Sequence, residues 1–360
     1  MLKLPTSPTT DTKNIPDAAL PFVKMHGLGN DFVMIALTDL TDHAPFIDAI
    51  KSGRNPLPGM AKIFCDRNFG IGADGLIIGF SLGNELSKKS VETAKNNVAE
   101  TDILKVLGAN YVNGGACDIG WIYINSDGSS SAMCGNGLRC LALWAVERKL
   151  VASSRLLVST KVGPVEIFVE TASGITVDLG QPILQPSLIP LTSDQTENFI
   201  AREIQTNSQT YNATCVSMGN PHAVIFDADS AKVSIESMKF DQALIEQSIE
   251  IQKNSLFPEG VNVEFARVSA KDQIEVLVFE RGCGPTLACA SGAAAVLVAG
   301  VLEGRTSRKA SVILPGGALS VEWSEATNHV LMSGPAAVVF EGAILASTLS
   351  QAISMEAIAS

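Results

Sequence analysis

Two cysteines open two similar segments of the 360-residue chain. Residues 134 to 146 read "CGNGLRCLALWAV", and residues 289 to 301 read "CASGAAAVLVAGV". Each segment has a Cys, a small residue, a polar residue and a Gly, followed by an apolar run of helical length, so Cys134 and Cys289 are predicted at helix starts. The unpaired N–H groups and the macrodipole of a helix start stabilise negative charge. We therefore expect the pKa of each thiol to be lowered from about 8.5 toward or below neutrality.

The same N–H groups can also receive a carboxylate, because the glycines let the backbone approach closely. If two halves of the chain face each other about a pseudo-twofold axis, the two cysteines would flank one bound carboxylate. One thiolate could remove the proton from the neighbouring carbon while the opposite thiol protonates the other face. This arrangement is the one that a two-base racemase needs.

Other interpretations of the cysteines stay open at this point. A lone Cys before a helix is more often a buried apolar residue, but filling of space does not explain a matched pair. Neither segment has the GxGxxG or GxxxxGK spacing of a phosphate site. A cysteine hydrolase could use His222 of "MGNPHAV" as its base, although one cysteine would then have no role. A thiol-redox or binding role without catalysis is the third alternative.

An internal repeat supports the idea of two halves. The turn segments "LGNDFVMI" (28 to 35) and "MGNPHAVI" (218 to 225) share Gly-Asn. The Gly-Asn to Cys separation is 134 − 30 = 104 residues in the first half and 289 − 220 = 69 in the second, so the first half has 35 extra residues. The polar stretch 81 to 118 lies between "DGLIIGF" and "IGWIYIN". We expect it to be an exposed insertion at a hairpin tip.

The remaining pattern predicts an α+β protein made of two homologous domains. Short Val- and Ile-rich strands dominate, with a few helices between them. We expect a flexible leader (1–21), an N-terminal half (22–155), a C-terminal half (156–328), strands that return to the first half (329–345) and a tail (346–360).

Composition excludes several classes of function. The net charge is −11 and no dense Lys/Arg cluster occurs, which argues against nucleic-acid and membrane partners. Apolar runs end well short of the ~20 residues of a membrane span, and the N-terminus has no secretory or transit pattern. Seven cysteines, an odd number without a CxxC pair, and only four histidines favour reduced thiols in a cytoplasmic protein without a metal site.

A family resemblance follows from eight segments. They are "FVKMHGLGNDF", "DRNFGIGADGL", "NSDGSSSAMCGNGLRC", "VSMGNPHAV", "VNVEFARV", "FERGCGPTLACASGAA", "LPGGALSVEW" and "SGPAAVVFEG". With these segments the chain resembles the diaminopimelate epimerases. The resemblance implies two pseudo-twofold-related domains, each a mostly antiparallel sheet around a central helix. It also implies epimerisation of LL- to meso-2,6-diaminopimelate without a cofactor, in lysine and peptidoglycan precursor synthesis. The partner would be a small diamino dicarboxylic acid, and a homodimer is compatible with the family.

The resemblance also implies site residues. Cys134 and Cys289 match the two acid/base groups, and His222 and Glu280 would contact an ammonium or tune the thiols. Arg281 suits a bidentate grip on the distal carboxylate. The family's asparagines match Asn30, Asn125, Asn220 and Asn262. The N–H groups that would bind the reacting carboxylate are those of Gly135, Asn136, Ala290 and Ser291.

Three positions depart from the family pattern. Gly75 stands where Gln is frequent, Pro285 where Glu is common and Ala290 where Gly is common. These changes affect substrate contacts more than reaction type. The alternative within the same fold is a proline racemase-like or phenazine-biosynthesis-type isomerase, whose cyclic or monocarboxylate substrate would not need Arg281.

Overall fold

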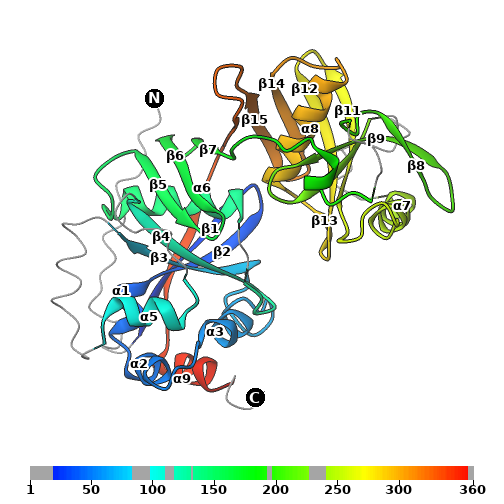
Figure 1. Ribbon diagram of the computed structural model, residues 1–360. Coiled ribbons are helices and arrows are strands. Elements are labelled where there is room, and N and C mark those ends of the chain that lie inside the picture. The colour runs from blue at the N-terminus through cyan, green and yellow to red at the C-terminus, as the bar shows by residue number, and fades with distance from the viewer. Residues whose placement is uncertain are drawn as a thin grey trace.

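The computed structural model describes residues 19–82, 98–109, 117–130, 133–192, 197–226 and 241–355. The chain forms two α+β units that lie side by side (Figure 1). Each unit has a strongly curved sheet around one central helix, α6 in the first unit and α8 in the second. The α+β class predicted from the sequence is confirmed.

The sheet of the first unit follows the order β1-β2-β3-β4-β5-β6-β7. The β2–β3 and β4–β5 pairs are parallel and the others are antiparallel. Helix α6 (Gly135–Glu147) connects β4 with β5. The strand bounds are β1 Leu20–Gly27, β2 Asn30–Ala36, β3 Gly75–Ser81, β4 Ile119–Asn125, β5 Arg155–Thr160, β6 Gly163–Thr171 and β7 Gly174–Asp178.

The second unit repeats this topology in the order β9-β10-β11-β12-β14-β15-β16. Its parallel pairs, β10–β11 and β12–β14, occupy the equivalent places, and α8 (Ala290–Leu302) precedes β14 as α6 precedes β5. The repeat seen in the sequence is therefore a repeat of structure. The bounds are β8 Arg202–Gln205, β9 Thr210–Ser217, β10 Pro221–Ile225, β11 Asn262–Ala270, β12 Gln273–Glu280, β13 Gly284–Thr286, β14 Lys309–Leu314, β15 Gly317–Trp323 and β16 Val330–Gly334.

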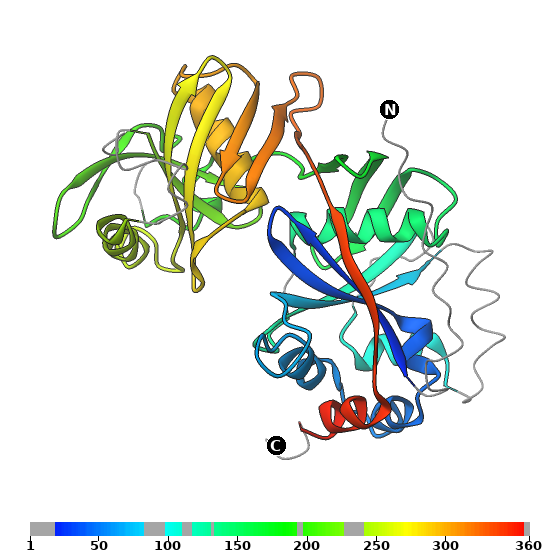
Figure 2. The same cartoon turned by 180° about the vertical axis from the view of Figure 1, so that it is seen from behind.

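The two units are joined through equivalent strands. β7 and β16 pair antiparallel, with Val177 opposite Met332 and Ile175 opposite Gly334. An antiparallel pair of equivalent strands is what a pseudo-twofold axis between the units requires. Beyond β16 the chain crosses to the first unit as β17 (Ala337–Ile344), which pairs antiparallel with β1 and is the long orange-red strand in Figure 2.

The central helices are buried, and apart from Asn136 and Arg139 the buried residues of α6 are apolar or glycine. Residues Gly135 to Ala145 of α6 are buried, and α8, with the sequence "ASGAAAVLVAGVL", is buried along most of its length. A helix that is apolar all round needs cover on all faces, and the curved sheet supplies it. One continuous core cluster contains residues of both helices.

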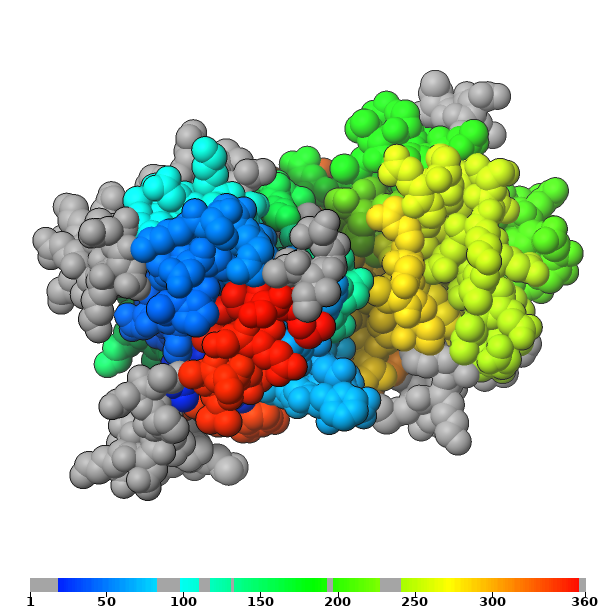
Figure 3. All heavy atoms as spheres, turned by 90° about the horizontal axis from the view of Figure 1, so that it is seen from below, coloured from blue at the N-terminus to red at the C-terminus, as the bar shows by residue number. Residues whose placement is uncertain are grey.

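Smaller helices cover the outer face of the first sheet. They include α1 (Leu37–Thr41), α2 (Ala44–Lys51), α3 (Leu57–Phe64) and α9 (Ala346–Ser354). Helix α9 (red in Figure 3) packs against α2 and α3 and buries Leu349, Ala352 and Ile353. Part of the predicted tail is thus a core element. On the second unit lie α7 (Gln242–Gln252) and the short 3-10 helix η2 (Pro186–Leu188).

The insertion 81–118 connects β3 and β4, whose ladder ends with Ser81 opposite Ile119. Much of it lies outside the described residues. Its described part contains α5 (Glu100–Val106), which buries Ile103 and Leu104 in the outer core. The expectation of an exposed insertion was therefore wrong for this helix, since it contributes buried apolar side chains. Among the described residues, no helix is both long and apolar enough to cross a membrane.

Candidate active site

Cys134 is the N-cap of α6. Its φ of −153° is extended, and its sulfur accepts a hydrogen bond from the N–H of Gly137 at 3.4 Å. The Asn30 side chain lies on its other side, with Oδ1 3.7 Å from Sγ. Asn30 begins β2 after a tight turn in which Leu28 and Gly29 have positive φ, as in a type I′ hairpin.

Cys289 caps α8 in the same way. Its φ of −126° is extended, and Sγ accepts from the N–H of Gly292 at 3.4 Å. The Ser291 hydroxyl lies 3.5 Å from the sulfur. Both cysteines therefore lie at the helix starts that the sequence predicts, each at the positive end of a buried helix.

The two helix starts lie against each other across the pseudo-twofold axis. A Cβ placed on Gly135 would lie 2.5 Å from the Cβ of Ala290. The Asn136 amide donates to the Ala288 carbonyl at 3.0 Å, a hydrogen bond between the units. The structure thus brings together Cys134, Gly135, Asn136, Cys289, Ala290 and Ser291.

The expected lowering of the thiol pKa was wrong. Burial raises the pKa of Cys134 to about 11, and the charge of Glu280 adds to the rise, although the N–H groups of Gly137 and Asn136 oppose it. The pKa of Cys289 also lies well above its ordinary value, because burial, Glu280 and Glu264 outweigh the hydrogen bonds from Ser291 and Gly292. Desolvation of the thiolate thus exceeds the stabilisation from the helix start.

Asn136 is also held by a buried cation. Arg139 has no exposed surface and donates to Asn136 Oδ1 at 2.9 Å and to the Pro335 carbonyl at 3.0 Å. Burial lowers the pKa of Arg139, opposed by the nearby thiols of Cys140 and Cys134. A guanidinium group under the first turn of α6 adds positive charge to that of the helix start.

The second unit has a buried histidine–carboxylate hydrogen bond beside its cysteine. His222 Nδ1 lies 2.7 Å from Glu264 Oε1 and Nε2 lies 3.0 Å from Asn220 Oδ1. Both His222 and Glu264 have no exposed surface. A Cβ on Gly292 would lie 3.0 Å from Glu264 Oε1, so this carboxylate contacts the first turn of α8. His222 is engaged at both ring nitrogens, which does not favour the hydrolase alternative.

The remaining predicted residues lie at strand ends around this centre. Asn262 begins β11, where its amide donates to the Pro221 carbonyl and its Oδ1 accepts from the Arg281 N–H. The Arg281 guanidinium is exposed and donates to the Glu259 carbonyl at 2.6 Å. Glu280 ends β12, and burial raises the pKa of its carboxyl group.

The side chain of Asn125 is hydrogen-bonded within its own loop and not to either thiol. It ends β4 and donates to the Ser129 hydroxyl at 2.9 Å. Its neighbour across the ladder is Gly75. A Cβ on Gly75 would lie 2.4 Å from Tyr123 Cε2, so the Tyr123 ring fills the space that a longer residue at position 75 would need.

Sequence reasoning missed Arg139, Glu264 and Tyr123. It also missed Asp74, whose carboxylate accepts from the Asn30 amide at 2.7 Å. Arg139 lies within the quoted motif "CGNGLRC", and Glu264 follows Asn262 by two residues, which places both side chains on one face of β11. That spacing could have identified Glu264. The burial of Arg139 could not be predicted, because it depends on Pro335 and Met332, about 195 residues away.

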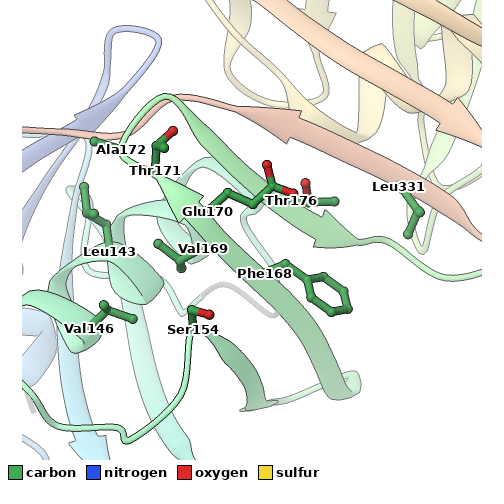
Figure 4. A pocket seen from close by; sticks show the side chains of 10 residues that line it. All are labelled: Leu143, Val146, Ser154, Phe168, Val169, Glu170, Thr171, Ala172, Thr176 and Leu331. Atoms are coloured by element: carbon green, nitrogen blue, oxygen red, sulfur yellow. The ribbon is translucent and has the colours of Figure 1, made fainter. Parts of the chain in front are cut away.

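A separate hollow of about 690 Å³ lies at the other end of α6 (Figure 4). It is lined by residues of α6, β6 and β7, among them Leu143, Val146, Phe168, Glu170 and Thr176. Cys134 caps the opposite end of the helix. The hollow therefore does not belong to the thiol site.

Comparison with solved structures defines the class of fold. A hydroxyproline epimerase from Agrobacterium vitis superposes with a TM-score of 0.56 at 11% identity, covering 91% of this chain and 93% of that one. A Bacillus anthracis protein of the PhzF phenazine-biosynthesis family gives 0.52 at 13% identity, covering 91% and 99%. At such low identity these matches establish the fold alone, the two-unit fold that this chain shares with both proteins.

The sequence comparison establishes the family. The family model described as diaminopimelate epimerase matches residues 22–185 and 214–339. A diaminopimelate epimerase of Heliobacterium modesticaldum is 38% identical over 330 residues, 90% of this chain and 99% of that protein. A chloroplastic diaminopimelate epimerase of Oryza sativa subsp. japonica is 38% identical over 331 residues, which cover 91% of this chain and 80% of that protein. The chain belongs to the diaminopimelate epimerase family and is an isomerase.

Proposed function

We propose that the protein interconverts LL- and meso-2,6-diaminopimelate without a cofactor, by a two-base mechanism that uses Cys134 and Cys289. The reaction would serve lysine and peptidoglycan precursor synthesis. The observation that carries the proposal is the meeting of two Cys-capped, buried helix starts across the pseudo-twofold axis. Membership of the diaminopimelate epimerase family supports the choice of substrate.

In this mechanism the reacting carboxylate binds between the two helix starts. The N–H groups of Gly135, Asn136, Ala290 and Ser291 surround it, and the two macrodipoles with Arg139 favour its charge. Electrostatic stabilisation of this kind acts on the negative charge that develops when the α-proton leaves.

The proton transfers then occur on opposite faces of the α-carbon. One thiolate takes the α-proton, the C–H electron pair remains on carbon, and the opposite thiol gives its proton to that carbon. The configuration inverts, and the two sulfurs exchange protonation states. A thiolate whose conjugate acid has a raised pKa is a stronger base, which suits a weakly acidic C–H group.

The other end of the substrate would lie toward Arg281. Its guanidinium can grip the distal carboxylate through two parallel hydrogen bonds. Glu280 and the asparagines Asn125 and Asn262 would receive ammonium groups. A monocarboxylate would leave Arg281 without this partner, which favours a dicarboxylate over proline.

The test is NMR of LL-diaminopimelate in D₂O with reduced protein. Wild type is expected to exchange the α-proton and form the meso isomer, while Cys134→Ala and Cys289→Ala abolish turnover. Cys283→Ala, at an exposed cysteine, is the matched control and should keep activity. Absence of exchange and epimerisation in wild type would overturn the substrate assignment. Full turnover by either active-site variant would overturn the two-base mechanism.

A further inference from the structure

Four polar side chains form one continuous chain of hydrogen bonds that passes beside Cys134. Arg139 Nη2 donates to Asn136 Oδ1 at 2.9 Å, and Asn136 Nδ2 lies 3.2 Å from Asn30 Oδ1. Asn30 Nδ2 donates in turn to Asp74 Oδ2 at 2.7 Å. The chain thus runs from α6 through β2 to the residue that precedes β3.

The polarity of this chain is fixed at both ends. A guanidinium group only donates, so the Asn136 oxygen must face Arg139 and its NH₂ must face Asn30 and the Ala288 carbonyl. An ionised carboxylate only accepts, so the Asn30 NH₂ must face Asp74. Both requirements give the same result, with the Asn30 oxygen turned toward Asn136 and Cys134. If either amide flipped, a donor would face a donor or an acceptor would face an acceptor in this chain of hydrogen bonds.

Asp74 is itself held in place. Its Oδ1 accepts from Arg67 at 2.7 Å, and its Oδ2 accepts from the Asp31 N–H at 3.1 Å. Arg67 and the buried Lys24 both pair with Asp31, at 2.9 and 2.8 Å. The Asp74 carboxylate is therefore a fixed acceptor for the Asn30 amide.

The fixed amide determines which form of Cys134 is stabilised. The Asn30 Oδ1, 3.7 Å from Sγ, can accept from an S–H group but opposes a negative sulfur. A flipped amide would instead offer N–H groups to a thiolate. The pKa of Cys134 is raised, first of all by burial, and an oxygen facing the sulfur acts in the same direction.

We propose that Asp74 is a positioning residue, which orients the Asn30 amide and thereby holds Cys134 as the protonated thiol in the free protein. The role rests on the proposed function in one respect, since it makes Cys134 the acid for the first substrate that binds. Asp74 acts through Asn30 and does not itself touch the sulfur.

The experiment measures the pH dependence of iodoacetamide alkylation of each cysteine, resolved by peptide mass spectrometry on the full chain. Asp74→Ala removes one of the two requirements that orient the Asn30 amide, so the amide can turn its NH₂ toward sulfur by giving up only the 3.2 Å hydrogen bond from Asn136. A hydrogen bond to a charged group is then gained, and we expect Cys134 to be alkylated about tenfold faster below its midpoint, a shift of about one pH unit downward. Cys289 in the same sample should not shift.

Arg67→Gln is the matched control, because Arg67 binds the same Asp74 carboxylate without contacting Asn30. In Arg67→Gln the alkylation rate of Cys134 should stay within about twofold of the wild-type rate at each pH. This change is much smaller than the change of about tenfold expected from a hydrogen bond to a charged group. An unshifted Cys134 in folded Asp74→Ala, or equal shifts in both variants, would overturn the proposal.

Folding is read in the same spectra, because Cys140 and Cys215 are 0% and 1% exposed, against 6% for Cys289, and react only on unfolding. If Asp74→Ala unfolds, Asp74→Asn replaces it, with a shift expected in the same direction. Alkylation does not depend on turnover. A Cys134 shift without epimerisation would refute the proposed function alone, while epimerisation without a shift would refute the positioning role alone.

Discussion

The contact between Gly135 and Ala290 predicts the effect of a single methyl group. In Gly135→Ala the new Cβ would lie 2.5 Å from the Ala290 Cβ. Ordinary carbon–carbon contact is ~3.5 Å, so the two helix starts must separate by about 1 Å. Gly135 does not have a positive φ, so no backbone strain is introduced, and the Met332 Cε, 3.2 Å from the new Cβ, is the end of a flexible side chain that can move.

The displacement acts where the reacting carboxylate would bind between two thiols. A misplacement of about 1 Å can lower the rate about 100-fold, and we expect this loss in kcat/KM for epimerisation. Overpacking should also lower the free energy of unfolding by about 1–3 kcal/mol. Activity is measured by NMR of α-proton exchange and stability by urea unfolding.

The matched control removes the opposing methyl group. Ala290→Gly alone should keep kcat/KM within about threefold of wild type, since it leaves the backbone N–H in place. The double variant Gly135→Ala/Ala290→Gly should recover most of the lost activity, because the clash is gone. Near wild-type activity in Gly135→Ala, or no recovery in the double variant, would refute the reasoning that the helix starts set the geometry.

Two further predictions concern stability. Gly75→Gln should lower the free energy of unfolding by about 1–3 kcal/mol, because its Cβ overlaps the Tyr123 ring and the Ile124 carbonyl; Tyr123→Ala should reduce that penalty in urea unfolding, and additive losses would contradict the overlap. Cys134 has a folded pKa of about 11, above its ordinary value of 9.0, so the stability it contributes is present below pH 9 and is lost as pH rises through 11. Between these pH values the free energy of unfolding of wild type should therefore fall by about 3 kcal/mol more than that of Cys134→Ser. If the urea midpoints of the two proteins change equally with pH across this range, the assigned pKa is refuted.

The repeated motifs predicted the architecture because they report local geometry. A Gly-Asn turn and a Cys-x-x-Gly helix start depend on a few adjacent residues, so both were predictable, and the topology repeats around them. The thiol pKa values were not predictable in this way. The sequence shows the helix start at Cys134, but the burial that outweighs it comes from packing of the whole unit around α6. The same holds for Arg139, whose partners are distant in sequence.

The pseudo-twofold axis relates the backbones but not the charges. Phe32 pairs with Gly75 in β2–β3 as His222 pairs with Asn262 in β10–β11. Two residues further along β3 and β11, Ile77 is then equivalent to Glu264. The buried His222–Glu264 pair beside Cys289 therefore has an apolar counterpart beside Cys134.

The same comparison extends to the strand ends and the helices. The register that pairs Val263 with Phe279 puts Glu280 opposite Asn262, as Asn125 lies opposite Gly75. Glu280 thus replaces a neutral amide. Five residues after each cysteine, Arg139 in α6 corresponds to Ala294 in α8.

The Cys134 side therefore carries an added cation, and the Cys289 side carries two added carboxylates and a histidine. For the proposed two-base reaction these unequal charges matter, because they favour the thiolate form at Cys134 and the thiol form at Cys289, whereas the Asn30 amide acts on Cys134 in the opposite direction. Symmetric surroundings would give both sulfurs the same pKa, and the two forms of the free protein with one thiol and one thiolate would then be equally populated. A duplicated backbone supplies two equivalent positions for sulfur, and the unequal side chains around them make the two sulfurs chemically distinct.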